Sequence, residues 1–251
     1  MIKRRYQYVM SKWEKDNLLQ EHEIIQSYMP EMKWLTKENL IEMLTDHPVL
    51  YMKPDTGMKG RGIIQLSHAP LGFVVRSSDS TEHIHTFDSL TVYLKSLVKN
   101  YKYIIQEGIP LLTLNEQPID FRVLAQRPME QWVYSGIVGK LGAKNGIITN
   151  FASGGKAISF RQAMMETMQL PFTEIKRRRD ELRDLSLVIA DHLTNTYPGL
   201  RELGIDYGID IHGNAWIIEV NTTPGHQLFK ALPNENIYRR IVRNFRLLNR
   251  H

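Results

Sequence analysis

The sequence predicts an α+β fold in which antiparallel strands and helices build two halves of one chain. A glycine-rich loop joins two strand-like segments rather than a strand and a helix, and a second pair of strands near the C-terminus is joined by a tight turn. Long amphipathic segments lie outside both pairs. A chain of 251 residues can bury a sizeable core, either as one large domain or as two interlocked halves.

Helices are predicted where apolar residues recur at helical spacing. The longest has Ile175 and Leu182 on one face and a run of basic residues near its start. Thr36 is placed to cap the start of a shorter helix, and Met29-Pro30 ends the first one. The predicted helices cover residues 11–27, 36–44, 87–99, 174–195 and 235–249.

Strands are predicted where short apolar runs lie between glycine, proline or polar residues. The segment from Pro48 to Pro54 has the length of a strand and is followed by the glycine-rich loop. Near the C-terminus, His212-Gly213-Asn214 separates two apolar segments, which predicts a hairpin. The predicted strands cover residues 48–54, 63–66, 72–76, 103–107, 121–126, 131–141, 204–211 and 215–221.

The composition excludes several classes of protein and of chemistry. With 42% apolar and 24% charged residues, the chain is not expected to be intrinsically disordered. The absence of cysteine excludes disulfides, a thiolate nucleophile and cysteine-based zinc or iron–sulfur sites. The small excess of 32 basic over 27 acidic residues is spread along the chain without a basic stripe interleaved with aromatics. It suits nucleotide phosphates, and nucleic acid is not an expected partner.

The N-terminus is basic and aromatic, and it lacks the apolar segment of a secretory signal. No stretch of the chain approaches the roughly 18 uninterrupted apolar residues that indicate a membrane span. We therefore expect a cytoplasmic protein without a membrane partner, or one that is assembled onto a structure built in the cytosol.

Acidic and amide side chains interrupt the C-terminal hairpin in a pattern that suits a metal ion. Asp206 and Asp210 are four residues apart on the first strand and therefore share a face, as do Glu219 and Asn221 on the second strand. Acidic residues that face a core are costly unless a cation compensates them. Such oxygen ligands suit Mg²⁺ bound together with phosphates. A solvated outer face is the alternative.

The loop between the first two strands has the composition of a phosphate-binding flap. Its glycines permit positive φ and a close approach of backbone N–H groups to a phosphate, and its basic residues supply charge. The Walker A pattern is absent, since Gly155-Lys156 lacks the earlier glycine and the following hydroxyl residue, and a dinucleotide fingerprint would need a helix after the loop. The loop residues that are expected to contact phosphate are Gly57, Lys59, Gly60, Arg61 and Gly62, and Lys53 lies just before the loop.

Together these features resemble the ATP-grasp superfamily. That family places a lysine before a glycine-rich flap, here Lys53-Pro54 and residues 57–62, and an Asp on the strand before a Glu-x-Asn strand, here Asp206 and Glu219-Val220-Asn221. The spacing of this metal motif and the Thr222-Thr223-Pro224-Gly225 after it resemble the D-alanine ligase branch. The segments that resemble the YheC/YheD group, described as endospore coat-associated, are Lys12-Trp13, Tyr28-Met29-Pro30-Glu31, Tyr51-Met52-Lys53-Pro54, Gly60-Arg61-Gly62-Ile63, Ile119-Asp120-Phe121-Arg122-Val123 and Asn150-Phe151-Ala152-Ser153-Gly154-Gly155.

The resemblance implies an ATP-grasp fold, in which the β-sheets of two α+β subdomains clasp ATP. It implies a helical lead-in over residues 1–45, a small subdomain with the flap over 46–103 and a large subdomain over 104–251. Most such ligases carry an N-terminal α/β domain before the grasp. This domain is expected to be missing here, because Lys12 lies so near the start of the sequence.

The resemblance also implies roles for single residues in phosphate and metal binding. Lys12 and Lys53 would hold the α- and β-phosphates of ATP, with Lys53 also catalytic, and the flap residues would close over them. Asp206, Glu219 and Asn221 would hold one or two Mg²⁺ ions.

Further roles concern the adenosine and the reacting groups. Asp120 would meet the ribose, and Arg122 would act in catalysis by facing the phosphates or the acceptor; an ion pair of Arg122 with Asp120 or Glu107 is the equal alternative. His226 and the loop over residues 150–156 are candidates for acceptor or phosphate contacts, against ordinary structural roles. The implied adenine hinge comprises Gln106, Glu107, Gly108 and Ile109.

The predicted function is that of an ATP- and Mg²⁺-dependent carboxylate–amine ligase, or a close variant, that acts through an acylphosphate in spore coat formation. The alternative is a spore coat structural or interaction protein that binds nucleotide without turnover. Spore coat proteins are possible partners, one of which would replace the surface of the missing N-terminal domain.

Overall fold

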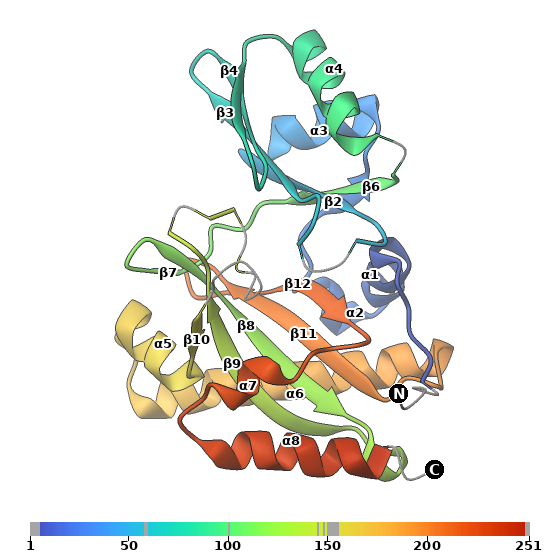
Figure 1. Cartoon of the computed structure of the whole chain (residues 1–251), viewed down its shortest axis with the longest axis vertical. Coiled ribbons are helices and arrows are strands. Elements are labelled where there is room, and N and C mark those ends of the chain that lie inside the picture. The colour runs from blue at the N-terminus through green and yellow to red at the C-terminus, as the bar shows by residue number, and fades with distance from the viewer. Residues whose placement is uncertain are drawn as a thin grey trace. The chain divides into compact units, whose positions relative to one another are not determined.

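The computed structural model describes residues 6–57, 60–99, 101–144, 146, 147, 149 and 156–248. The chain divides into two compact units, one formed by Met1–Met29 with Leu111–His251 and the other by Pro30–Pro110. Each unit contains an antiparallel sheet with helices packed beside it (Figure 1). The predicted α+β class is therefore confirmed.

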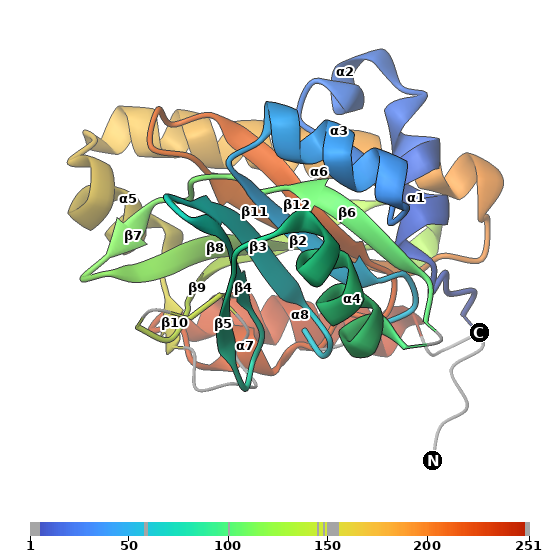
Figure 2. The ribbon, with the colours of Figure 1, turned by 90° about the horizontal axis from the view of Figure 1, so that it is seen from above.

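The smaller unit, Pro30–Pro110, contains a six-stranded sheet in the order β1-β6-β2-β3-β4-β5. Helices α3 (Lys37–Asp46) and α4 (Phe87–Val98) lie over one face of this sheet (Figure 2). Thr36 caps α3 as predicted, because its hydroxyl accepts a hydrogen bond from Asn39 N at 3.1 Å. The strands are β1 (Met32–Trp34), β2 (Val49–Pro54), β3 (Ile64–Ala69), β4 (Gly72–Arg76), β5 (Thr81–Ile84) and β6 (Tyr103–Glu107).

Successive side chains of β2 alternate between the core of this unit and the opposite face of its sheet. Leu50 and Met52 are fully buried in the core that the sheet forms with the helices. Tyr51 and Lys53 point to the opposite face, because successive side chains of a strand alternate. β2 and β3 pair antiparallel, so the glycine-rich loop joins two neighbouring strands, as predicted.

The larger unit contains a sheet in the order β10-β9-β8-β11-β12, with β7 paired to β8. Its strands are β7 (Thr113–Leu114), β8 (Gln117–Gln126), β9 (Val133–Leu141), β10 (Lys156–Ile158), β11 (Glu202–Ile209) and β12 (Ala215–Asn221). Its helices are α1 (Lys12–Gln20), α2 (Glu23–Gln26), α5 (Phe160–Met168), α6 (Phe172–Thr196), α7 (Gln227–Lys230) and α8 (Glu235–Leu248), with a 3₁₀ turn η1 (Pro128–Glu130). None of the helices in the described part of the chain has the length and apolar character that a membrane span requires.

Helices cover both faces of the larger sheet. Phe121 and Val123 of β8 belong to the main core, which includes the apolar face of α6. Leu124, which points to the other face, packs in a smaller core with residues of α7 and α8. By the same alternation, Asp120 and Arg122 share the face of Leu124 and lie nearer the start of the strand.

Several elements differ from the sequence prediction. The helix predicted over residues 11–27 is two helices, because the side chain of His22 accepts a hydrogen bond from Ile24 N at 3.2 Å and caps the start of α2. The predicted strand over residues 131–141 begins only at Val133, after the 3₁₀ turn η1. The elements absent from the prediction are mostly short: β1, β5, β7, β10, α5 and α7.

The boundaries of the two units also differ from the subdomain limits expected from the sequence. Residues from Pro30 onward belong to the smaller unit, which extends to Pro110, whereas Met1–Met29 joins the larger one. The reason is strand pairing, since β6 pairs with both β1 and β2. A boundary between residues 103 and 104 would cut β6 just after its first residue.

Candidate active site

Four neighbouring strands of the larger unit bring charged side chains to one face of the sheet. Asp206 on β11 lies opposite Glu219 on β12 and opposite Arg122 on β8. Asp120 on β8 lies opposite Lys140 on β9. Directly opposed residues of antiparallel strands point to the same face, so register alone gathers these groups.

The Asp206 carboxylate is held by two basic side chains. Arg122 Nε donates to Oδ1 at 2.5 Å and Nη2 to Oδ2 at 2.6 Å, while Lys140 Nζ lies 3.0 Å from Oδ1. Burial opposes ionisation, but the positive charges of Arg122 and Lys140 outweigh it and lower the pKa of Asp206 to about 2. Asp206 is therefore ionised at neutral pH. The ion pair considered for Arg122 exists, but its partner is Asp206 rather than Asp120 or Glu107.

Asp120 forms a second buried contact in the same cluster. Its Oδ1 lies 3.0 Å from Lys140 Nζ, and its Oδ2 accepts a hydrogen bond from the hydroxyl of Thr149. Burial raises the pKa of Asp120 to about 6 against the opposing charge of Lys140. Both oxygens of Asp120 thus contact side chains of its own unit.

Lys140 is the site residue that the sequence reasoning missed. It bridges Asp120 and Asp206, and its side chain is only 10% exposed. The available signal was a lysine inside the apolar strand segment 131–141, where a charge needs a partner. Thr149 gave no comparable signal, because its contact depends on how the segment after β9 folds.

Lys12 is held near the metal motif by the start of α1. Its Nζ lies 3.5 Å from Oε1 of Glu219, and its side chain is 9% exposed. The preceding segment is tied to the loop after β12, because Val9 N donates to the Thr222 hydroxyl at 3.0 Å and that hydroxyl donates to Val9 O at 3.2 Å. Lys15 Nζ donates to the same Val9 carbonyl at 3.0 Å. A phosphate contact for Lys12 stays a prediction.

The donor chemistry of Asp206, Glu219 and Asn221 fits a hard divalent cation. Asp206 faces Glu219, and Gly204, two residues earlier on β11, faces Asn221. The set offers two carboxylates and one amide oxygen, the ligands that Mg²⁺ takes together with phosphates. Within the described residues no group of three or more His, Cys, Asp or Glu side chains is arranged to hold a metal. A cation here would therefore depend on Asn221 and on oxygens of a ligand.

Asp210, which the sequence placed on the face of Asp206, serves the turn after β11 instead. Its Oδ1 accepts hydrogen bonds from His212 N at 2.9 Å and Asn214 N at 2.8 Å. Its Oδ2 accepts from Asn214 Nδ2 and from Trp216 Nε1, both at 3.0 Å. Burial opposes ionisation of Asp210, but these hydrogen bonds together outweigh it and lower the pKa of Asp210. Its charge thus stabilises the hairpin rather than a ligand.

The smaller unit holds the other predicted lysine on the face opposite its helices. Lys53 of β2 is buried, and its Nζ donates to Oε1 of Gln106 on β6. On the same face, Gln65 Nε2 donates to the Tyr51 hydroxyl at 2.7 Å. The structure thus joins Lys53 to the first residue of the predicted hinge.

The glycine-rich loop is described except for Met58 and Lys59, so the expectation for Lys59 lies outside the described residues. Gly60 and Gly62 adopt positive φ values of 69° and 74°, which favour glycine. A Cβ on Gly62 would also lie 2.8 Å from the Tyr103 hydroxyl. Arg61 between these glycines is exposed.

The predicted adenine hinge is largely bonded within its own unit. Glu107 N donates to Glu31 O at 2.9 Å, and Gly108 N donates to Val49 O at 2.8 Å. The Glu107 carboxylate accepts from Glu31 N at 3.2 Å. These N–H groups are engaged, so contacts with adenine by Glu107 and Gly108 would have to use other atoms. The expectation for Gln106 and Ile109 is unaffected.

His226 belongs to a largely buried polar network, and its contact with an acceptor stays a prediction. Its Nε2 lies 2.7 Å from Oε1 of Glu202, which also accepts from Gln126 Nε2 at 3.0 Å. Ser135 connects this network to α8, because its hydroxyl donates to Gln126 Oε1 at 2.6 Å and accepts from Asn244 Nδ2 at 3.1 Å. Of the loop over residues 150–156, only Lys156 is described.

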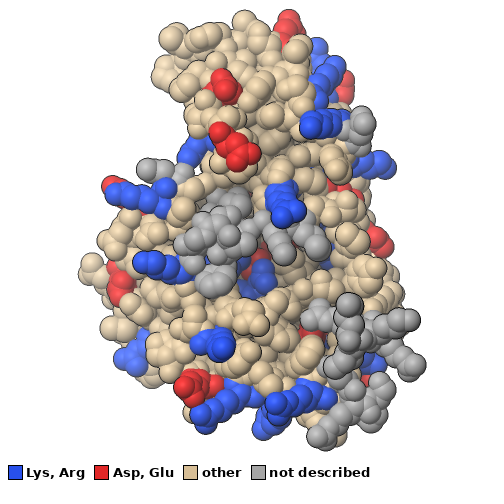
Figure 3. Space-filling model, in the orientation of Figure 1, with Lys and Arg blue, Asp and Glu red and all other residues tan. Residues whose placement is uncertain are grey.

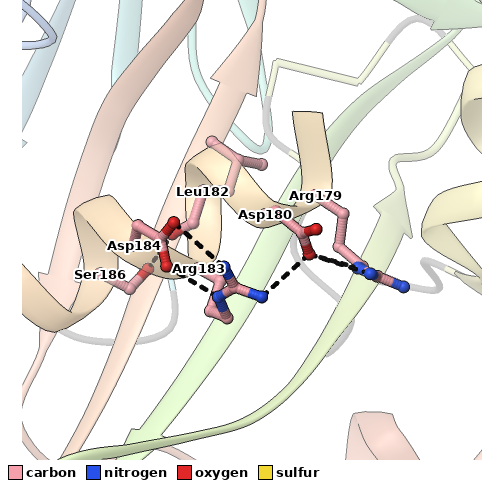
Figure 4. Close-up of polar contacts among 6 residues, drawn as sticks. All are labelled: Arg179, Asp180, Leu182, Arg183, Asp184 and Ser186. Atoms are coloured by element: carbon pink, nitrogen blue, oxygen red, sulfur yellow. Dashed lines mark hydrogen bonds and ion pairs between the residues drawn. The ribbon is translucent and has the colours of Figure 1, made fainter. Parts of the chain in front are cut away.

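Four arginines of α6, at positions 177, 178, 179 and 183, pair with acidic residues of the same helix. Arg183 donates to Asp180 at 3.1 Å and to Asp184 at 2.7 and 3.0 Å, and Arg179 donates to Asp180 at 2.9 Å (Figure 4). On α8, by contrast, Arg243 and Arg246 are exposed, and basic side chains gather along this helix in Figure 3. The small excess of basic over acidic residues is thus not concentrated on α6.

Two proteins of Bacillus subtilis (strain 168) are similar in sequence. Endospore coat-associated protein YheD is 26% identical over 226 residues, which cover 87% of this chain and 49% of that protein. Endospore coat-associated protein YheC is 23% identical over 222 residues, which cover 86% of this chain and 60% of that protein. The chain thus spans only about half of the length of these relatives.

A solved structure shares the fold, and a family match covers nearly the whole chain. The crystal structure of D-cycloserine synthetase DcsG superposes with a TM-score of 0.57 at 9% identity, covering 95% of this chain and 70% of that one. The YheC/D-like ATP-grasp family matches residues 5–247. This match includes both units and the strands that gather the charged cluster, so the chain belongs to the YheC/D-like ATP-grasp family, as its motifs predicted.

Proposed function

We propose that the chain is an ATP- and Mg²⁺-dependent ligase that joins a carboxylate to an amine, or to a related nucleophile, through an acylphosphate. The observation that supports this most strongly is the cluster on the larger sheet. Oxygen donors of Asp206 and Glu219 oppose each other there, with Arg122 and Lys140 within ion-pair distance of Asp206. Bound Mg²⁺ would neutralise phosphate charge in such a site.

The proposed reaction has two steps. A carboxylate oxygen of the acceptor attacks the γ-phosphorus of ATP, the bond from that phosphorus to the bridging oxygen breaks, and ADP leaves. An amine then attacks the acyl carbon, inorganic phosphate leaves, and the amine nitrogen loses a proton. The protein contributes positioning and charge stabilisation and no covalent nucleophile.

Residues of the larger unit take the following roles in this proposal. Asp206, Glu219 and Asn221 hold the cation, and Arg122 stabilises negative charge on the transferred phosphoryl group. Lys12, 3.5 Å from Glu219, holds a phosphate. Asp120 would meet the ribose, as the resemblance implies, and its contacts with Lys140 and Thr149 support a further role in positioning Lys140.

Residues of the smaller unit would bind the rest of the nucleotide. Lys53, which donates to Gln106, would contact the phosphates. The loop with Gly57, Gly60, Arg61 and Gly62 would cover them, since its positive-φ glycines let backbone N–H groups approach a phosphate closely. The hinge from Gln106 to Ile109 would meet the adenine.

A second candidate is a coat structural or interaction protein that binds nucleotide without turnover. It is favoured by the names of YheD and YheC, which describe association with the endospore coat and no reaction. Under either candidate we propose that the chain acts in the cytoplasm or at the spore coat, with coat proteins as partners.

A phosphate-release assay with a panel of amino acids and peptides separates the two candidates. Turnover that is lost in Glu219→Ala supports the ligase. The matched control is Glu235→Ala, because Glu235 is exposed on α8 and pairs only with the exposed Arg239 among the ion pairs of the described residues. Calorimetry with ADP and Mg²⁺ is run in parallel. Tight binding without turnover on any acceptor contradicts the ligase and supports the structural role.

A further inference from the structure

The metal-ligand carboxylate of this site already has counter-ions from the protein itself. Lys140 Nζ lies 3.0 Å from Asp206 Oδ1 and 3.0 Å from Asp120 Oδ1. Arg122 contacts both oxygens of Asp206 at 2.5 and 2.6 Å. The side chains of Asp120, Asp206 and Lys140 are each at most 10% exposed, so water screens these charges little.

A bare divalent cation meets two obstacles at Asp206. It must approach a carboxylate that is flanked by two buried positive groups, which repel it at short range. It must also displace one of them, and a buried cation that loses its partner is costly. An anionic ligand that arrives with the metal removes both obstacles, because its phosphate oxygens accept the displaced group.

Lys140 is better placed for displacement than Arg122. Its contact with Asp206 is a single one, whereas Arg122 is bidentate. Lys140 also keeps a second partner, because Asp120 stays within 3.0 Å and lies opposite it in the sheet. The ammonium group can therefore turn from Asp206 toward a ligand without losing all of its compensation.

We infer that Lys140 is an internal counter-ion of Asp206 that makes the site take a divalent cation and a polyphosphate together and disfavours the cation alone. This inference rests on the proposed function, since it concerns the same metal and nucleotide. It assigns to Lys140 a positioning role that the sequence motifs did not indicate. The coupling is reciprocal, so the nucleotide also binds better when the cation is present.

The test measures binding only and needs no acceptor. Mn²⁺ binding is followed by electron paramagnetic resonance with and without saturating ADP, corrected for the Mn²⁺–ADP complex in solution. We expect Lys140→Met to bind Mn²⁺ alone about tenfold more tightly and to reduce the coupling between Mn²⁺ and ADP about tenfold, within the usual range of such couplings. Lys144→Met is the matched control, since Lys144 is 64% exposed and pairs with Glu116 at 2.6 Å.

A double variant keeps the test valid if Lys140→Met alone folds poorly. Asp120→Asn with Lys140→Met removes a buried acid together with its partner and leaves the net charge of the cluster unchanged. Tighter Mn²⁺ binding by the double variant therefore reports lost competition rather than added negative charge. This inference is overturned if both variants keep the Mn²⁺ affinity and the coupling of the wild type. The proposed function is unaffected by that result as long as the wild type binds Mn²⁺ and ADP. Wild-type protein that binds no ADP in the presence of Mn²⁺ overturns the proposed function as well.

Discussion

Replacing Arg122 with methionine removes two of the three charged contacts that the Asp206 carboxylate makes within the described residues. The two lost contacts are those from Nε and Nη2 at 2.5 and 2.6 Å, and Lys140 at 3.0 Å remains. The Asp206 side chain is only 6% exposed, so water cannot replace the guanidinium. Methionine keeps much of the aliphatic volume, so the change tests charge rather than packing.

Loss of one partner from a buried ion pair costs roughly 3–5 kcal/mol. Because Lys140 still compensates Asp206, we expect a value near the lower end, about 3 kcal/mol. For a protein of this size each kcal/mol lowers the melting temperature by about 2–4 °C, which gives a fall of roughly 6–12 °C. The double variant Arg122→Met with Asp206→Asn removes both charges and should lie within about 1 kcal/mol of the wild type.

Urea denaturation of the wild type, both single variants and the double variant completes a double-mutant cycle. The expected coupling energy is at least about 2 kcal/mol. Arg239→Met is the control, because Arg239 and its partner Glu235 are both more than 70% exposed, and we expect a change within about 0.5 kcal/mol. Additive losses, or a loss below about 1 kcal/mol in Arg122→Met, would refute the argument that this pair is buried and strongly coupled.

Three further predictions follow from single contacts. Burial raises the pKa of Asp120 to about 6 from 3.8, so the folded state holds this proton more tightly than the unfolded state. The unfolding free energy should therefore fall as the pH rises from about 4 to about 6. Asp120→Asn should abolish this pH dependence in urea titrations. Gly204→Ala places a Cβ 2.7 Å from the Cβ of Pro224 and should cost about 1–3 kcal/mol in thermal melts, whereas Gly225→Ala, with nothing within 4 Å of its Cβ, should be near neutral. Asp210→Ala leaves the donors of the β11–β12 turn unsatisfied and should lower the unfolding free energy by about 1–3 kcal/mol; an unchanged denaturation midpoint would contradict the turn role.

The sequence was sufficient for features that depend on local periodicity. The common face of Glu219 and Asn221 follows from the two-residue period of a strand. The hairpin character of the glycine-rich loop follows from the apolar runs on either side of it, and β2 and β3 pair accordingly. The break between α1 and α2 was missed, because the cap at His22 interrupts a pattern whose apolar spacing continues.

Side-chain partners across strands could not be predicted in the same way. Arg122 and Asp206 are 84 residues apart, and their contact exists because β8 and β11 pair in one particular register. The expected partners, Asp120 and Glu107, were nearer in sequence. Asp210 was misplaced for the opposite reason: it shares the strand face of Asp206, but the turn after it and Trp216 at the start of β12 provide four nearby donors.

By itself the sequence determined most of the longer elements, the donor types and the face of each strand on which they lie, because propensity and alternation act over a few residues. Only the tertiary structure decided that Lys140 bridges Asp120 and Asp206 and that Arg122 clamps Asp206. Register between distant strands is set by how their apolar faces pack against α6 and against α7 and α8. The charge state of the candidate site is therefore a property of packing, which no short stretch of the chain encodes.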